Sequence, residues 1–152
     1  MSPVYLDSSA WVKRYCRETG SDRVTTLFAS GRQLLCSRLG LVEVVAALAR
    51  KRKSGSLSPD TFENLRGKVQ ADWESFWKID LSARLMADAE RIASTLALRG
   101  ADAVHFASVL SIQASLAADQ QQATLVASDR ELVEAARAAG MPALDPELDA
   151  LV

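Results

Sequence analysis

Short apolar runs alternate with longer segments of helical periodicity along this chain. The first run begins close to Met1, and at least one helical segment separates each run from the next. The predicted strands are Val4–Leu6, Gln33–Cys36, Trp77–Leu81, Ala123–Ala127 and Ala143–Leu144. Strands that alternate with helices favour parallel pairing, so we expect an α/β fold with helices around one parallel sheet.

Capping residues and glycines mark the ends of the helices. The predicted helices run from about Asp22 to Ser30, from Arg38 to Lys53, from Ser58 onward, from Ser82 to Gly100, from Asp102 to about Ala118, and from Ser128 to near Gly140. Pro59 suits the first helical position after Ser58, and Ser128 with Glu131 predicts a capping box. Gly100 is expected to close the helix that Ser82 opens.

Composition narrows the class of protein. The 152 residues suit a single domain spanning residues 1–152, and 49% hydrophobic with 24% charged residues is typical of globular proteins. No uncharged apolar stretch of about 18 residues indicates a membrane helix, and no signal peptide is evident. Two cysteines and one histidine are too few for a disulfide scaffold or a four-ligand zinc site. We therefore expect a cytoplasmic protein without a membrane partner.

The chain has a net charge of −1 and a pI near 5.8, so it lacks the excess of basic residues found in many nucleic-acid binders. Any contact with phosphate must come from a local patch. Candidates are Lys13, Arg14 and Arg17, and the run Arg50–Lys53 at a helix end.

Four acids fall where predicted strands give way to helices: Asp7, Glu43, Asp102 and Asp129. Asp7 and Asp129 each follow a strand, Glu43 lies about one turn into the helix after the second strand, and Asp102 opens a helix. Ligands of open α/β sheets bind outside the carboxyl ends of the strands. The acids converge there if the first and fourth strands are neighbours.

Each acid also has a structural explanation. Asp7 can cap the helix that follows it, and Asp102 and Asp129 lie in first helical turns, where the helix dipole favours an acid. Glu43 is harder to explain, because its neighbours are mostly apolar and a helix apolar on nearly all sides is normally buried. Its structural alternative is a narrow polar stripe shared with Gly40, Ala46, Ala47 and Arg50, with Arg50 as a loose partner.

Four converging carboxylates would repel one another unless cations neutralised them. Mg²⁺ and Mn²⁺ prefer oxygen ligands, and Mg²⁺ is commonly held by few carboxylates together with waters and a substrate phosphate. Such a cation activates water and stabilises charge on a scissile phosphate. The four acids therefore indicate metal-assisted hydrolysis of a phosphodiester bond.

At these four places the chain resembles a PIN-domain protein, specifically the VapC-type toxin branch of that family. Tyr5–Lys13 resembles the first family motif, an acid after the first strand followed by small hydroxyl residues, and Leu41–Leu48 resembles the helix that carries the glutamate. Ala101–Ala107 resembles the Asp-Ala-x-His-x-Ala helix start, and Leu125–Leu132 resembles the fourth motif. Each motif is short, but the four in order make a specific signal over nearly the whole chain.

The resemblance implies a PIN-like three-layer α/β/α sandwich with a central parallel five-stranded sheet. It implies a Mg²⁺- or Mn²⁺-dependent endoribonuclease that acts on RNA, forms a homodimer and is held inactive by a small cognate antitoxin. By residue, Asp7, Glu43 and Asp102 match the core metal ligands, and Asp129 matches a more variable fourth acid that can act through water. Ser9 matches a hydroxyl that supports the first acid.

Two other functions stay open. A non-catalytic PIN-fold module that binds RNA or protein fits the acidic pI. It also fits Ala127, which stands where many family members carry Thr or Ser, with Ser128 as the nearest substitute. A related nuclease of DNA flaps or of RNA processing fits the same acids, although the short chain argues against it. A Mn²⁺ titration separates the non-catalytic module from the nucleases.

The remaining chemistry-bearing residues have mainly structural explanations. His105 is expected to pack or hydrogen-bond, or to orient a site residue. Trp11 and Tyr15 are expected in the core or a dimer interface rather than as stacking partners for RNA bases. Core packing between the long helices is also expected for three further aromatic residues, with an antitoxin or dimer groove as the alternative. They are Trp73, Phe76 and Trp77.

Overall fold

The computed structural model describes Met1–Val152 and contains a five-stranded sheet in which all neighbouring strands are parallel. The strands are β1 Val4–Leu6, β2 Leu34–Ser37, β3 Trp77–Ile79, β4 Thr124–Val126 and β5 Ala143–Leu144. Their spatial order is β3-β2-β1-β4-β5, so β1 is the central strand. The predicted parallel five-stranded sheet is confirmed.

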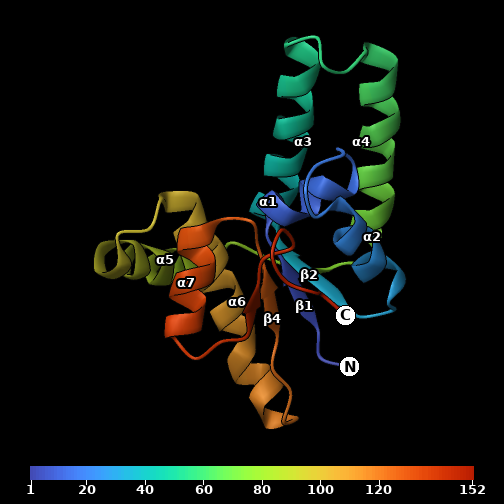
Figure 1. Cartoon of the computed structure of the whole chain (residues 1–152). Helices are drawn as coiled ribbons and strands as arrows, with labels where there is room; N and C mark the ends of the chain where they lie inside the picture. Colours follow the sequence, from blue (N-terminus) through green and yellow to red (C-terminus); the bar gives the residue numbers. More distant parts are fainter.

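Helices connect every strand to the next. They are α1 Ser8–Trp11 with the 3₁₀ turn η1 Val12–Arg14, α2 Ser21–Ala29, α3 Arg38–Lys53, α4 Pro59–Glu74, α5 Ala83–Leu96, α6 Gly100–Ala118 and α7 Arg130–Ala138. The chain moves from β1 to β3 in one direction and then crosses back to β4 and β5. Right-handed crossovers therefore place the two sets of helices on opposite faces. Figure 1 shows α5, α6 and α7 on one side of the sheet and α1 and α2 on the other, which confirms the three-layer sandwich.

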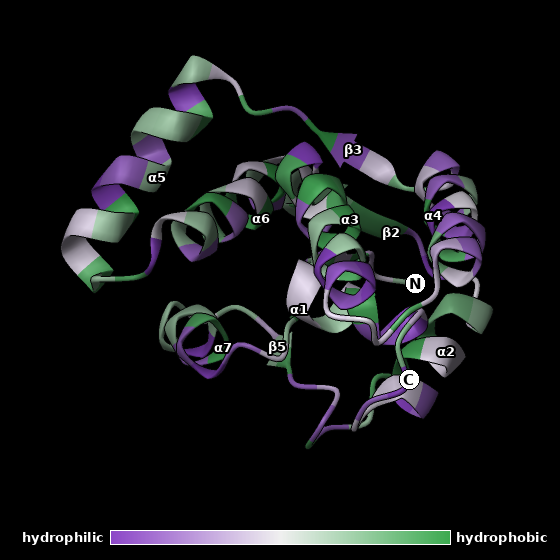
Figure 2. Ribbon diagram, turned by 90° about the horizontal axis from the view of Figure 1, so that it is seen from above, coloured by the Kyte–Doolittle hydropathy of each residue, from purple (hydrophilic) through white to green (hydrophobic).

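The helices α3 and α4 form an antiparallel pair that extends beyond the carboxyl edge of the sheet (Figure 1). Seen from above in Figure 2, α3 points along the line of sight, between α6 and α4. None of the helices combines the length and apolar character that a membrane crossing requires.

The core is built around the central strand. All three residues of β1 are fully buried, as expected for a strand covered by helices on both faces. Trp11 is fully buried and stacks on Trp73 and Phe76, with ring centroids 5.6 Å and 4.8 Å away. Core packing is thus confirmed for these three aromatic residues. Trp77 differs: it lies on the edge strand β3 and is 54% exposed.

Two predicted helix boundaries are wrong. Gly100 does not close α5 but begins α6, because Ala97 adopts the left-handed conformation (φ 52°) and ends α5 earlier. Ser128 does not cap α7. Its N-cap is Asp129, whose carboxylate accepts a hydrogen bond from the Leu132 N–H at 3.0 Å, so Asp129 precedes the first turn.

Three strand predictions need smaller corrections. The second strand is shifted by one residue to Leu34–Ser37, and the run Ala123–Ala127 pairs only over Thr124–Val126. The run Trp77–Leu81 pairs only to Ile79, because the next residue, Asp80, turns to the surface and forms an ion pair with Arg38.

Candidate functional site

The sheet order brings the ends of β1 and β4 together. The Asp7 N–H donates to the Val126 carbonyl at 2.9 Å, which continues the pairing of the two strands to the carboxyl edge. The chain direction across the sheet reverses between these strands, and such a switch point is the usual place for a ligand in open α/β folds. Asp7 and Asp129 therefore share one edge, as expected from the sequence.

Asp7 caps α1 and also contacts His105, the residue that connects it to Glu43. Its Oδ2 accepts hydrogen bonds from the Ser9 N–H at 3.1 Å and from the Ser9 hydroxyl at 2.5 Å. Ser9 Oγ in turn accepts from the Ser128 N–H at 2.9 Å, which joins the turn after β1 to the turn after β4. Asp7 is only 2% exposed, and its Oδ1 is buried without a hydrogen-bond partner.

His105 bridges Asp7 and Glu43. Its Nε2 lies 2.5 Å from Glu43 Oε1 and 3.2 Å from Asp7 Oδ1, and its geometry directs the hydrogen bond to Glu43. On the other side of the ring, Nδ1 lies 2.7 Å from the Tyr5 hydroxyl. The His105 side chain is almost fully buried, so it orients and neutralises the acids from inside the protein.

The charge of the two acids sets the protonation of His105. Burial lowers the pKa of the imidazole, but the neighbouring carboxylates of Asp7 and Glu43 outweigh it, and the His105 pKa is raised above its ordinary value. The prediction that His105 packs or hydrogen-bonds is correct, and the ring contacts the carboxylates directly.

The surroundings of Glu43 differ from the prediction. The helix α3 is not buried all round, since Val42 is 64% exposed and the buried positions form a single stripe. Glu43 is half-buried at the edge of that stripe. Its partner is His105 and not the exposed Arg50.

Asp102 and Asp129 share a second cationic partner, Arg99. The Arg99 Nε lies 3.0 Å from Asp102 Oδ2, and its Nη2 forms an ion pair with Asp129 Oδ2. Burial raises the pKa of the Asp102 carboxyl; Arg99 opposes this, while the charges of Asp129 and Asp7 add to it, and the net shift is upward. Asp102 lies in the first turn of α6, as predicted.

The site residues fit a hard divalent cation in chemistry, although no group of three side chains is already arranged as a metal centre. All four acids offer oxygen ligands, which Mg²⁺ and Mn²⁺ prefer. The buried Asp7 Oδ1 lacks a hydrogen bond, and a buried carboxylate oxygen normally has a partner. His105 contacts Asp7 and Glu43, and Arg99 contacts Asp102 and Asp129, so a divalent cation would compete with these two side chains for the carboxylates.

The basic residues near Asp7 in the sequence are already engaged by acids. Lys13 is buried between Glu18 and Glu147, at 3.2 Å and 2.8 Å. Arg14 pairs with Asp72 at 3.4 Å, and Arg17 pairs with Asp22 at 2.8 Å. Burial keeps Lys13 from a phosphate backbone, whereas Arg17, with its side chain 82% exposed in a surface pair, stays a candidate.

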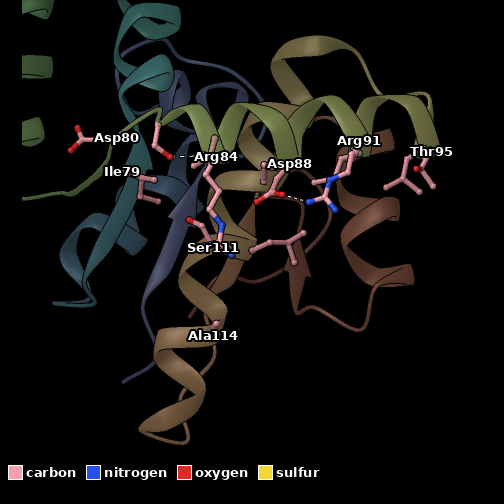
Figure 3. A pocket seen from close by; sticks show the side chains of 14 residues that line it. Ile79, Asp80, Arg84, Asp88, Arg91, Thr95, Ser111 and Ala114 are labelled. Atoms are coloured by element: carbon pink, nitrogen blue, oxygen red, sulfur yellow. Dashed lines mark hydrogen bonds and ion pairs between the residues drawn. The ribbon is translucent and has the colours of Figure 1, made fainter.

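A groove of about 900 Å³ lies away from the acids, between α5 and α6 (Figure 3). Leu85, Ile92 and Leu110 are among its apolar lining residues, and Asp88 and Arg91 form an ion pair on its wall. None of the four acids lines it.

Two residues of the site were missed in the sequence. Arg99 could have been found from its position three residues before Asp102, since side chains at this spacing meet on a helix. Tyr5 could not be found from its local sequence. A tyrosine in a buried strand is predicted to be a core residue whether or not its hydroxyl contacts a residue such as His105, far away in the sequence.

Comparison with known proteins identifies the family of this chain. Residues 4–138 match the family described as PIN domain. Ribonuclease VapC45 of Mycobacterium tuberculosis is 37% identical over 153 residues, covering 98% of this chain and 99% of that protein.

Two solved structures share the fold. FitAB bound to an IR36 DNA fragment has a TM-score of 0.71 and 15% identity, covering 98% of this chain and 99% of that one. A toxin–antitoxin complex from Klebsiella pneumoniae has a TM-score of 0.60 and 13% identity, covering 94% and 97%. With a family match over most of its length and a full-length relative at 37% identity, this chain belongs to the PIN-domain family, in its VapC-type branch.

Proposed function

We propose that this chain is an endoribonuclease toxin that hydrolyses RNA phosphodiester bonds with Mg²⁺ or Mn²⁺ held by Asp7, Glu43, Asp102 and Asp129. The observation that carries the proposal is the buried Asp7 carboxylate, whose Oδ1 has no hydrogen-bond partner and lies 3.2 Å from the His105 ring, beside Glu43. The name of the VapC45 relative, a ribonuclease, supports the choice of reaction.

Each side chain has a distinct part in this proposal. Asp7, Glu43 and Asp102 would hold the cation, with Asp129 acting directly or through water. A bound divalent cation supplies the positive charge that activates water and stabilises the negative charge developing on the phosphate. Ser9 fixes the orientation of Asp7 through its 2.5 Å hydrogen bond, and His105 holds Glu43 from the interior.

The proposal extends to partners and location. A neighbour of the same fold is described as a toxin–antitoxin complex, which supports a small cognate antitoxin as the protein partner of this chain. We further propose that the chain forms a homodimer and acts in the cytoplasm, as a single domain over residues 1–152.

The test is cleavage of total cellular RNA by purified wild-type protein and by Asp7→Asn, each with Mg²⁺, with Mn²⁺ and with EDTA. Asparagine keeps an oxygen that accepts from the Ser9 N–H, so the cap survives while the charge is lost. Wild-type protein should cleave RNA only with a metal, and Asp7→Asn should lose at least about 100-fold in rate, or about 2.7 kcal/mol of transition-state stabilisation.

Asp22→Asn is the matched control. Asp22 lies on the exposed surface of α2 and pairs only with Arg17, so its loss should leave cleavage unchanged. Equal cleavage by wild type and Asp7→Asn would reject the proposal. A wild-type protein that binds RNA without cleaving it in any metal would point instead to the non-catalytic module.

A further inference from the structure

Arg99 stands at the open side of the acid cluster. It is the N-cap residue of α6, and its side chain is 73% exposed, whereas the side chains of Asp102 and Asp129 are 9% and 16% exposed. The guanidinium contacts both acids and so spans the starts of α6 and α7. One face of this cation is held by carboxylates, and the rest of it is open to solvent.

The contacts of Arg99 leave several donors free. A guanidinium carries five N–H donors in a planar fork. Asp102 accepts from Nε and Asp129 accepts from Nη2, and Nη1 makes no hydrogen bond or ion pair with the protein. Planar donors of this kind match the oxygens of a phosphate. The two acids also restrict the rotamers of the side chain before any ligand arrives.

Other cations near the acids lack this combination. Lys13 is buried by two glutamates, and His105 is 1% exposed beneath Asp7 and Glu43. An RNA backbone that approaches the four acids is repelled by them, and Arg99 is the solvent-exposed positive charge in contact with the cluster.

We propose that Arg99 binds a backbone phosphate of single-stranded RNA and positions it beside the acid cluster, using the donors that Asp102 and Asp129 leave free. This assignment rests on the proposed function for its choice of RNA, and it adds a phosphate-binding residue to the metal-binding acids. The acids aim the guanidinium, and the guanidinium offsets their repulsion of the substrate.

The experiment measures binding of a uridine decanucleotide to the full chain in EDTA, where cleavage is suppressed, at four or more salt concentrations. Each phosphate contact to a single strand contributes about 0.7 to the slope of log affinity against log salt. Arg99→Gln should bind about tenfold more weakly at low salt and lower the slope by about 0.7. Arg99→Lys keeps the positive charge but lacks the planar guanidinium donors. It should therefore show the salt dependence of the wild type and only part of the wild-type affinity.

The matched control is Arg91→Gln. Arg91 is 76% exposed and pairs with an acid three residues away, as Arg99 does, but it lies on the α5–α6 groove (Figure 3). Arg91→Gln changes the net charge by the same amount as Arg99→Gln, and it should bind the oligonucleotide like the wild type. An unchanged slope in Arg99→Gln, or an equal loss in Arg91→Gln, overturns the assignment.

Cleavage of RNA by the wild type with Mg²⁺ is measured in parallel. If the wild type cleaves RNA while Arg99→Gln has the salt slope of the wild type, only the assignment of Arg99 is rejected. If the wild type fails to cleave while the slope falls in Arg99→Gln, Arg99 remains a phosphate-binding residue and the proposed reaction is rejected.

Discussion

The Tyr5 hydroxyl lies 2.7 Å from His105 Nδ1, inside the core and across 100 positions of sequence. The same hydroxyl accepts a hydrogen bond from the Ser37 N–H at 3.2 Å, which leaves its own hydrogen free to donate to Nδ1. In the neutral ring the proton is then on Nε2, where it donates to Glu43. In the neutral ring, the buried tyrosine thus keeps the proton on the nitrogen that faces the acids.

Replacement of Tyr5 by phenylalanine should therefore affect both folding and the site. Two buried polar groups lose their partner, which should lower the free energy of unfolding by about 1–3 kcal/mol. His105, which orients the acids, also loses its hydrogen bond to Tyr5. This loss should weaken Mn²⁺ binding by at least about tenfold. Urea denaturation and calorimetric Mn²⁺ titration measure the two effects.

Tyr15→Phe provides the comparison, because the Tyr15 hydroxyl contacts Asp72 and Trp11 and no site acid. It should be destabilised while keeping its affinity for Mn²⁺. If both variants keep Mn²⁺ affinity, the Tyr5 hydroxyl does not act on the site.

The single histidine makes the protonation of the site measurable in the metal-free protein. Because the folded-state pKa of His105 is raised above its unfolded value of about 6.5, its protonation stabilises the fold fully below that value. This stability is lost as the pH rises through the folded pKa. NMR titration of the imidazole should show the raised pKa, and added Mg²⁺ should lower it by taking over the charge compensation of the acids.

In His105→Gln, the free energy of unfolding measured by urea denaturation should lose this pH dependence between about pH 5 and pH 9. A titration with the ordinary histidine pKa, unmoved by Mg²⁺, would contradict the electrostatic account of the site.

The aromatic cluster should contribute strongly to the free energy of unfolding. Trp11 is fully buried against Trp73 and Phe76, so Trp11→Ala should lower the free energy of unfolding by about 3–5 kcal/mol. Trp77 is 54% exposed on the edge strand, and Trp77→Ala should cost about 1 kcal/mol or less. Urea denaturation of both variants tests the difference, and similar losses would show that the cluster is not packed as described.

Gly40 permits the close approach of α3 to the sheet. A Cβ at this position would lie 2.2 Å from Cys36 Sγ and 3.5 Å from His105 Cε1. Gly40→Ala should therefore cost about 1–3 kcal/mol through overpacking. Because Cys36→Ala removes the clashing sulfur, the double variant should recover at least about 1 kcal/mol relative to the sum of the single effects. Additive effects in this double-mutant cycle would mean that the helix moves to accept the methyl group.

The parts of the fold that local pattern determines could be predicted from the sequence. The buried strand before Asp7 and the cations that end α3 at Lys53 are visible within a few residues. Asp7 and Asp129 could be assigned to one edge because each follows a parallel strand. The end of α5 could not be predicted, since Ala97 is not a residue that favours the left-handed conformation it adopts there.

The partners of the acids were harder to predict than the acids themselves. The pairing of Glu43 with His105 joins α3 to α6 across 62 positions, and the local pattern of neither helix specifies it. Arg99 was overlooked because an exposed arginine usually has a purely solvated role, and its second contact, Asp129, comes from another helix.

The hydrogen bond from the Ser128 N–H to Ser9 also has a consequence for chain synthesis. The two residues are 119 positions apart, and they join the turns that carry Asp7 and Asp129. At roughly 5–20 residues per second, a ribosome adds the second turn on the order of ten seconds after the first. Throughout that interval the growing chain contains Asp7 but cannot complete the acid cluster, so the site is among the last features of the molecule to form.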